Sequence, residues 1–77
     1  PKAIGKDPKS MLQEYLQSKK IDVPVYEVLA IEGEAHCQVF RVECRVPKFN
    51  ITTQGEGSSR RAAEQEAAKL AYAQITA

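Results

Sequence analysis

The sequence has almost no net charge, because 11 lysines and arginines face 10 aspartates and glutamates and leave a formal charge of +1. A uniformly basic surface is therefore excluded, and any attraction for a polyanion has to come from a local cluster of cations. Long apolar runs are also missing, since none approaches the roughly 20 residues that a membrane-spanning helix needs. The start of the chain does not resemble a signal peptide. We therefore expect no membrane partner.

The two cysteines, Cys37 and Cys44, are too few for a disulfide-stapled fold. They are seven residues apart in a segment that alternates like a strand, which separates them by roughly 23 Å at about 3.3 Å per residue. A disulfide needs Cα atoms within about 7 Å, and two thiols with one histidine fall short of a four-ligand zinc site. We expect reduced, packed cysteines in a cytoplasmic protein, with no metal or cofactor bound to this chain.

With 77 residues the chain has room for one small domain, which buries only about 60–65% of its unfolded surface. Apolar residues make up 43% and charged residues 27%, which are ordinary values for a globular protein. The first six residues (PKAIGK) lack periodicity. We therefore expect residues 1–6 to be a linker and residues 7–77 to form the domain.

Two segments have the apolar spacing of helices. The first begins at Asp7, which can cap free amides, and Pro8, which suits the first helical position because no donor is needed there. It ends near Lys19-Lys20, and its apolar stripe consists of Met11, Leu12, Tyr15 and Leu16. The second runs from Ser59 to about Ile75, with a stripe of Ala63, Ala67, Leu70 and Ala71 and with Ala68 beside it. Small residues on that face would let the helix approach a sheet closely.

Three segments between the helices are typical of strands. Val25–Ile31 is rich in β-branched and aromatic residues, and Phe40–Val46 alternates apolar and charged residues with a period of two. A short third strand is expected near Ile51 to Gln54. The order predicts an α+β fold of α-β-β-β-α form, with two helices packed on one face of a three-stranded antiparallel sheet.

No set of residues in this sequence has the spacing of a catalytic site. Ser58 and Ser59 have only His36 as a possible base, without a recognisable carboxylate to orient it. Glu64 and Glu66 diverge by about 200° on a helix and cannot share a metal ion. We therefore expect no catalytic residue here, and no enzyme activity from this chain alone.

The start of the second helix is a candidate site for anions. Ser59, Arg60 and Arg61 follow the glycine pair Gly55 and Gly57. Free amides, the helix dipole and two guanidinium groups would all attract a phosphate there. The alternative is an ordinary capped helix start in which Arg60 pairs with Glu64 one turn later, worth only about 0.3–0.5 kcal/mol. Spacing alone leaves both interpretations open.

Three other polar side chains have a functional and a structural interpretation. Gln13 and Glu14 on the first helix are either solvent-facing residues or acceptors for a ribose 2′-OH, a donor that DNA lacks. His36, in a loop beside Gly33, is either an idle imidazole or a partner for a sugar hydroxyl or a base edge. Lysines such as Lys9 add diffuse attraction for a polyanion or only solvate the surface.

The combination of these motifs resembles the double-stranded RNA-binding domain family. The shared features are the order of elements, the Gln13-Glu14 pair, a Gly-x-Ala-His loop at residues 33–36 and the Gly-x-Gly-x-Ser-basic-basic-x-Ala pattern at residues 55–63. The resemblance extends from Asp7 to about Ile75. Residues 6–17 and 57–65 are similar in particular to the C-terminal domain of bacterial ribonuclease III.

The resemblance implies how duplex RNA would be bound. In the family, the first helix and the loop between the first two strands enter successive minor grooves, and the last helix spans the major groove between them, over about 16 base pairs. Gln13 and Glu14 would then touch 2′-hydroxyls, His36 would enter the second minor groove, and Ser59, Arg60 and Arg61 would hold phosphates. The auxiliary contacts implied are Lys9, Ser10 and Ala35.

The same resemblance implies a larger parent protein. It would be a ribonuclease III in which a separate, Mg²⁺-dependent, homodimeric domain cleaves structured precursor RNA such as ribosomal transcripts, while this chain holds the duplex. The sequence departs from the family at Glu64, where a third lysine is frequent, and at Glu34, where proline is common. Both departures add negative charge and lower the expected affinity.

Two other functions stay open from the sequence. Some domains of this fold act as protein–protein modules, although the joint presence of Gln13, Glu14, His36, Arg60 and Arg61 argues against that function here. The parent could also be an RNA-binding protein without nuclease activity.

Overall fold

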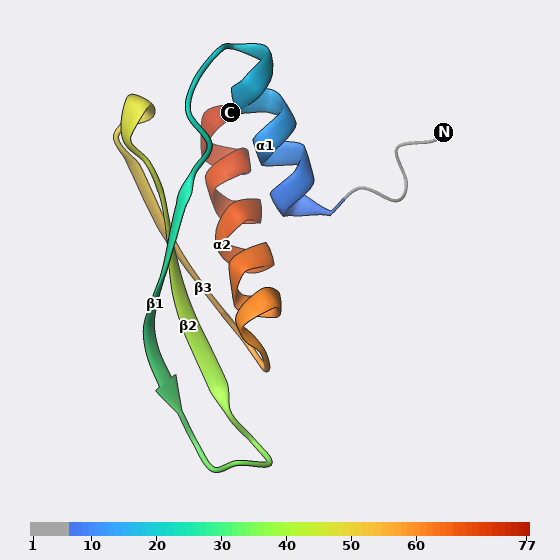
Figure 1. Cartoon of the computed structure of the whole chain (residues 1–77), viewed down its shortest axis with the longest axis vertical. Helices are drawn as coiled ribbons and strands as arrows, with labels where there is room; N and C mark the ends of the chain where they lie inside the picture. Colours follow the sequence, from blue (N-terminus) through green and yellow to red (C-terminus); the bar gives the residue numbers. More distant parts are fainter. Residues whose placement is uncertain (1–6) are drawn as a thin grey trace.

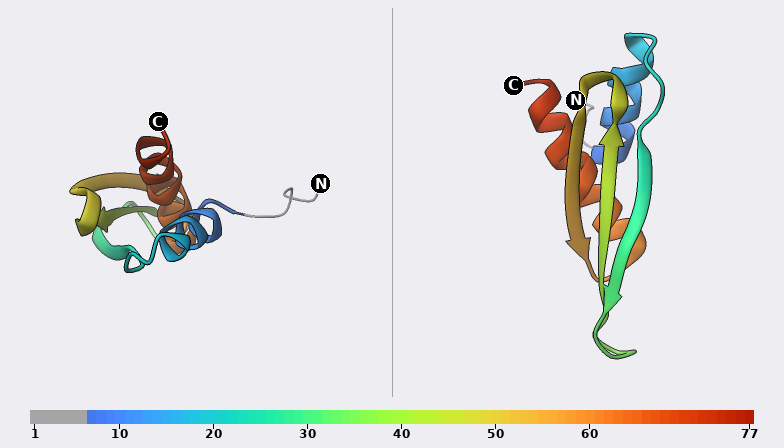
Figure 2. Two further views of the ribbon diagram at one scale, coloured as in Figure 1. Left: turned by 90° about the horizontal axis from the view of Figure 1, so that it is seen from above. Right: turned by 90° about the vertical axis from the view of Figure 1, so that its left-hand side faces the viewer.

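The structure, a computed structural model, describes residues 7–77, which form two helices and a three-stranded sheet. The elements are α1 (Pro8–Ser18), β1 (Val25–Glu32), β2 (Val39–Val46), the short 3-10 helix η1 (Pro47–Phe49), β3 (Ile51–Gly57) and α2 (Arg60–Ile75). Both helices lie on one side of the sheet (Figure 1; Figure 2, right). The predicted α+β class and α-β-β-β-α order are therefore confirmed. The expected linker, residues 1–6, lies outside the described residues.

Local chemistry sets both ends of α1. At its start, the Asp7 carboxylate accepts a hydrogen bond of 2.8 Å from the Ser10 amide, and Pro8 occupies the first turn. At its end, Lys20 adopts a positive φ of 60°. The Ile21 amide then donates back to the Leu16 carbonyl over 2.9 Å, and the chain turns toward β1.

The sheet has the order β1-β2-β3, with both neighbouring pairs antiparallel. Val42 on the central strand lies opposite Val28 of β1 and Gly55 of β3. A bulge between Val28 and Ala30 interrupts the register of β1, which is one edge of the sheet.

Strand β3 is longer than the sequence predicts, since it continues past Gln54 to Gly57. A Cβ atom on Gly55 would lie 2.3 Å from the Ala67 amide nitrogen, and one on Gly57 would lie 2.7 Å from the Ala62 Cβ. The two glycines therefore allow α2 to lie directly against β3. They belong to the sheet and not to a loop before the helix.

The core lies between the sheet and the two helices. Its largest buried side chains include Leu12, Leu16, Val42 and Val46. Helix α2 contributes the predicted small residues Ala63, Ala67, Ala68 and Ala71. Leu70 was predicted to belong to the same stripe but is 45% exposed. The buried face of α2 is rotated toward Glu64 and Ala68, where α1 packs, and this rotation carries Leu70 toward solvent.

The two cysteines occupy different environments, and both are free thiols. Cys44 is buried in the core, where burial raises the pKa of its thiol. Cys37 is exposed, so the prediction that both cysteines pack inside is wrong for Cys37. It lies in the connection between β1 and β2, beyond the part of the sheet that the helices cover (Figure 1).

Candidate nucleic-acid interface

The start of α2 presents both arginines to solvent. The Ser59 hydroxyl oxygen accepts a hydrogen bond of 3.1 Å from the Ala62 amide and caps the helix. The amides of Arg60 and Arg61 have no acceptor within residues 7–77 and remain available to a ligand. The two arginine side chains are 61% and 78% exposed. Amide donors, guanidinium groups and the positive end of the helix dipole thus coincide here.

The start of α1 lies beside the start of α2. A surface hollow of about 190 Å³ is lined by residues from both helices, namely Asp7, Lys9, Ser10, Gln13, Arg61 and Gln65. The structure therefore brings together four of the predicted contact residues from chain positions about fifty residues apart. Gln13, Glu14 and Ser10 are exposed, and Lys9 is half-buried.

Three polar links join the two helix starts. The Lys9 amide donates to the Gln65 side-chain oxygen over 3.0 Å, and the Lys9 ammonium lies 2.6 Å from a Glu64 oxygen. An Arg61 terminal amino group lies 3.4 Å from Asp7. The Lys9 ammonium also lies 4.9 Å from the centre of the Tyr26 ring on β1. Sequence reasoning missed Gln65 and the interhelical part of Glu64, because their partner is 55 or 56 residues away.

The Arg60–Glu64 ion pair, which the alternative interpretation of the helix start predicts, is also present. Arg60 Nε donates to a Glu64 carboxylate oxygen over 2.9 Å, yet the arginine side chain stays 61% exposed. Capping, pairing and exposure to a ligand are therefore compatible at this site. Glu64 itself is buried, with an exposed fraction of 8%.

Two carboxylates of this region have shifted pKa values. Burial raises the pKa of Glu64, but the hydrogen bonds from Lys9 and Arg60 outweigh burial, so the pKa lies below its ordinary value. The pKa of Asp7 is lowered mainly by the hydrogen bond from the Ser10 amide, with smaller contributions from Ser10 and Gln65 side chains and from Arg61. Both groups are therefore ionised at neutral pH.

His36 lies in a separate part of the surface, in the connection between β1 and β2. Gly33 starts this connection with a φ of +93°, and a Cβ there would lie 2.4 Å from the Cys37 carbonyl oxygen. Ala35 and His36 are both exposed. The connection projects at the end of the molecule toward which the start of α2 points (Figure 1). Within residues 7–77, no hydrogen bond or ion pair joins His36 to the helix starts.

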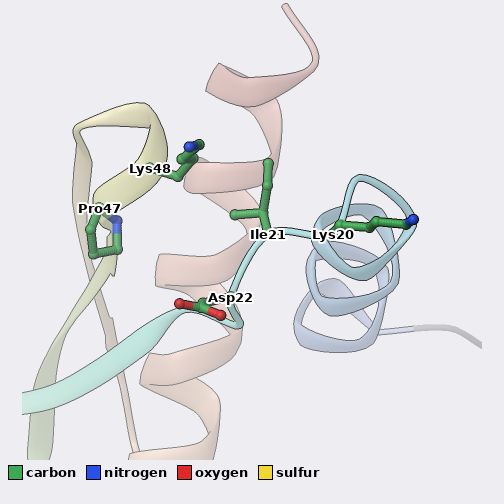
Figure 3. A pocket seen from close by; sticks show the side chains of 5 residues that line it. All are labelled: Lys20, Ile21, Asp22, Pro47 and Lys48. Carbon is green, nitrogen blue, oxygen red and sulfur yellow. The ribbon is translucent and has the colours of Figure 1, made fainter.

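A further hollow lies at the opposite end of the molecule. It measures about 410 Å³ and is lined by Lys20, Ile21, Asp22, Pro47 and Lys48. Figure 3 shows the Lys20 side chain pointing away from the other four, so the two lysines do not converge on one point. This hollow contains none of the predicted contact residues.

Two other kinds of site are absent from the described part of the chain. Residues 7–77 contain no group of three or more histidine, cysteine, aspartate or glutamate side chains that could hold a metal ion. Neither α1 nor α2 is long and apolar enough to span a bilayer.

The α-β-β-β-α fold is that of a double-stranded RNA-binding module. The chain belongs to the family described as the double-stranded RNA binding motif, whose pattern matches residues 8–75. It is 62% identical over 72 residues to a ribonuclease 3 of Nitrosomonas eutropha, covering 94% of this chain and 29% of that protein. It is 59% identical over 71 residues to a ribonuclease 3 of Ralstonia pickettii, covering 92% and 28%. The chain thus spans less than a third of the length of these relatives.

Solved structures agree with this membership. The structure of Arabidopsis HYL1, described in connection with miRNA processing, superposes with a TM-score of 0.76 at 35% identity, covering 91% of this chain and 97% of that one. The two double-stranded RNA-binding domains of DRB4 with their linker match with a TM-score of 0.69 at 28% identity, covering 99% of this chain and 48% of that one.

Proposed function

We propose that this chain binds A-form double-stranded RNA by its shape, through three clusters that contact the two minor grooves and the phosphates between them. The observation that carries this proposal is the shared hollow of α1 and α2, which joins Gln13 to Arg61 on one surface. The β1–β2 connection, which projects at the end of the molecule toward which the start of α2 points, would supply a third contact along the long axis of the molecule (Figure 1; Figure 2). A duplex with regularly spaced grooves matches such an arrangement.

The start of α2 would hold the phosphates. Arg60 and Arg61 offer forked donors, and their two amides offer additional ones. The Ser59 hydroxyl accepts from Ala62 through its oxygen, and its own proton remains able to donate to a phosphate oxygen. These contacts carry no sequence information, in keeping with recognition by shape.

The exposed side of α1 would read the ribose. Gln13 and Glu14 provide oxygens that accept a hydrogen bond from a 2′-OH, and this contact distinguishes RNA from DNA. Lys9 and Ser10 line the same hollow and add secondary contacts. His36, with the backbone of Ala35, would enter the next minor groove.

We also propose the nature of the parent protein. The curated relatives are ribonucleases of about three times this length, which supports a ribonuclease III as the parent. We infer that this parent cleaves structured precursor RNA, including ribosomal transcripts, in the cytoplasm. The Mg²⁺ ions and the homodimer contacts of that activity would be supplied by the rest of the parent protein. This chain would hold the substrate.

A gel-shift titration tests the binding function. The chain is titrated with RNA and DNA duplexes of identical sequence, about 20 base pairs long, and with the single RNA strand. We expect binding to the RNA duplex, and weaker binding to the other two ligands. Equal failure with both duplexes would contradict the proposal and support a protein–protein module.

A further inference from the structure

Glu64 is the one charged residue that is buried within residues 7–77, with an exposed fraction of 8%. A buried carboxylate is costly unless it is paired on both oxygens. Here each oxygen has its own partner from a different helix: the Lys9 ammonium of α1 at 2.6 Å, and the Arg60 Nε of α2 at 2.9 Å. Glu64 therefore connects the two helix starts that form the candidate interface.

The contact with Arg60 leaves the outer part of the guanidinium unused. Arg60 donates to Glu64 through Nε, and its two terminal amino groups have no hydrogen-bond partner within residues 7–77. A planar guanidinium held at Nε points its terminal pair in one direction, which suits a phosphate. Lysine has a single ammonium and cannot serve an internal carboxylate and an external phosphate with the same directed geometry.

The contact between Glu64 and Lys9 sets the position of the start of α1 against α2. Lys9 is held at three points: its amide by Gln65, its ammonium by Glu64, and the same ammonium over the Tyr26 ring. Gln13 lies one helical turn after Lys9 on α1. The contacts that hold Lys9 against α2 therefore also set the position of Gln13 relative to Arg60.

We propose that Glu64 is a positioning residue for duplex RNA, one that aims Arg60 at a phosphate and sets the spacing between α1 and α2. This inference rests on the proposed function. It reverses the expectation from charge alone, in which a carboxylate beside a phosphate site only weakens binding. Removing the charge of Glu64 should therefore weaken RNA binding, even though the domain becomes more positive.

The first experiment compares Glu64→Gln with Glu66→Gln. Both variants lose one negative charge from α2, but Glu66 is exposed and serves as the matched control. Glutamine at residue 64 has the size of glutamate but presents an amide nitrogen to one of the two cations. We expect E64Q to bind the RNA duplex about tenfold more weakly, or about 1.4 kcal/mol. Glu66→Gln should bind as well as the original chain or slightly better.

The dependence on salt separates positioning from general destabilisation. Both variants are measured well below their melting temperatures, with folding checked by circular dichroism. E64Q should also show a shallower log-log salt slope, by roughly 0.7–0.9, because one phosphate contact is lost. A folded E64Q that binds as tightly as the original chain or more tightly would overturn the proposal.

A second pair of variants does not depend on the folding of E64Q. Arg60→Lys should lose nearly as much affinity as Arg60→Ala, whereas Arg41→Lys, at an arginine that pairs with Glu56 over 2.9 Å on the open face of the sheet, should stay within about twofold of the original chain. Equal tolerance of lysine at both positions would overturn the role of Glu64. If the unchanged chain fails to bind the duplex at all, the proposed function itself fails, and the two failures are thereby distinguishable.

Discussion

The molecule has two pairs of arginines on two surfaces, and only one pair is available to a ligand. Arg41 and Arg45 lie on β2, where each faces two carboxylates, and their side chains are 38% and 40% exposed. The carboxylates are Glu32 and Glu56 for Arg41, and Glu27 and Glu43 for Arg45. Arg60 and Arg61 each face a single carboxylate and are 61% and 78% exposed.

The difference lies in how much of each guanidinium is already bound. The pKa of Arg41 is raised by its hydrogen bond to Glu56 and by the charge of Glu56, and the pKa of Arg45 is raised by its hydrogen bond to Glu27 and by the charge of Glu43. A phosphate approaching either one would have to displace a carboxylate and would meet the repulsion of its neighbours. The number of cations is therefore the same on the two surfaces and does not distinguish them. What distinguishes them is how far each guanidinium is already paired with carboxylates.

The largest effect should come from removing the exposed pair. The double variant Arg60→Ala with Arg61→Ala should bind the RNA duplex roughly a hundredfold more weakly, because two charge-assisted contacts are lost. The log-log salt slope should become shallower by roughly 1.4–1.8, which is twice the value for one phosphate. Fluorescence anisotropy over a salt series measures both quantities.

The matched control is the double variant Arg41→Ala with Arg45→Ala, which removes the same formal charge. Its affinity should stay within about threefold of the original chain, with an almost unchanged salt slope. Equal losses from the two double variants would show that net charge governs binding. Such a result would contradict the proposal that Arg60 and Arg61, and not Arg41 and Arg45, contact the RNA.

The order of elements could be predicted from the sequence because it depends on local patterns. Asp7 and Pro8 mark a helix start by their chemistry, and the alternation in Phe40–Val46 marks a half-covered strand. The family resemblance implies that Gln13 and Arg61 contact the same RNA duplex, and the structure places both residues in one hollow. Their contacts with RNA stay predictions.

The remaining features depend on contacts between distant segments. The role of Gly55 follows from the nearness of α2, which converts an expected loop into strand. The exposure of Leu70 follows from the side on which α1 packs. The sequence predicts that Glu64 weakens the basic cluster, because a third lysine is frequent at that position in the family. The contact of Glu64 with Lys9 on the other helix cannot be seen in the sequence.

The next effect concerns the choice of RNA over DNA. Glu14→Ala removes acceptors for a 2′-OH, so the affinity for the RNA duplex should fall about fivefold, while the weak affinity for the DNA duplex should be unchanged or rise. Glu27→Ala on the open face of the sheet is the control and should leave the ratio of the two affinities unchanged. A falling melting temperature for Glu14→Ala, with the ratio preserved, would instead assign Glu14 a structural role.

Acid should lower the free energy of unfolding, because it protonates Glu64 and removes its ion pairs with Lys9 and Arg60. The folded-state pKa of Glu64 lies below its ordinary value of 4.5, so its ion pairs stabilise the fold above that pH and are lost as pH falls through the lowered pKa. Unfolding by urea between pH 7 and pH 2 should show the free energy of unfolding decreasing below about pH 4.5. The E64Q variant should show a smaller decrease. An E64Q curve parallel to that of the original chain would contradict this assignment.

The smallest effect should be on stability, from loss of the arginine contacts on the open sheet. Exposed ion pairs contribute little because water screens them and because ordering two long side chains costs entropy. Arg41→Ala with Arg45→Ala should therefore change the melting temperature by less than about 4 °C, and by less still at high salt. A large loss would mean that these contacts hold the sheet together, in which case Arg41 and Arg45 are engaged for structural reasons. A small loss would mean that the carboxylates around Arg41 and Arg45 contribute little to stability. Their remaining effect is then to repel a polyanion from the open face of the sheet, so that it binds on the side of α1 and α2.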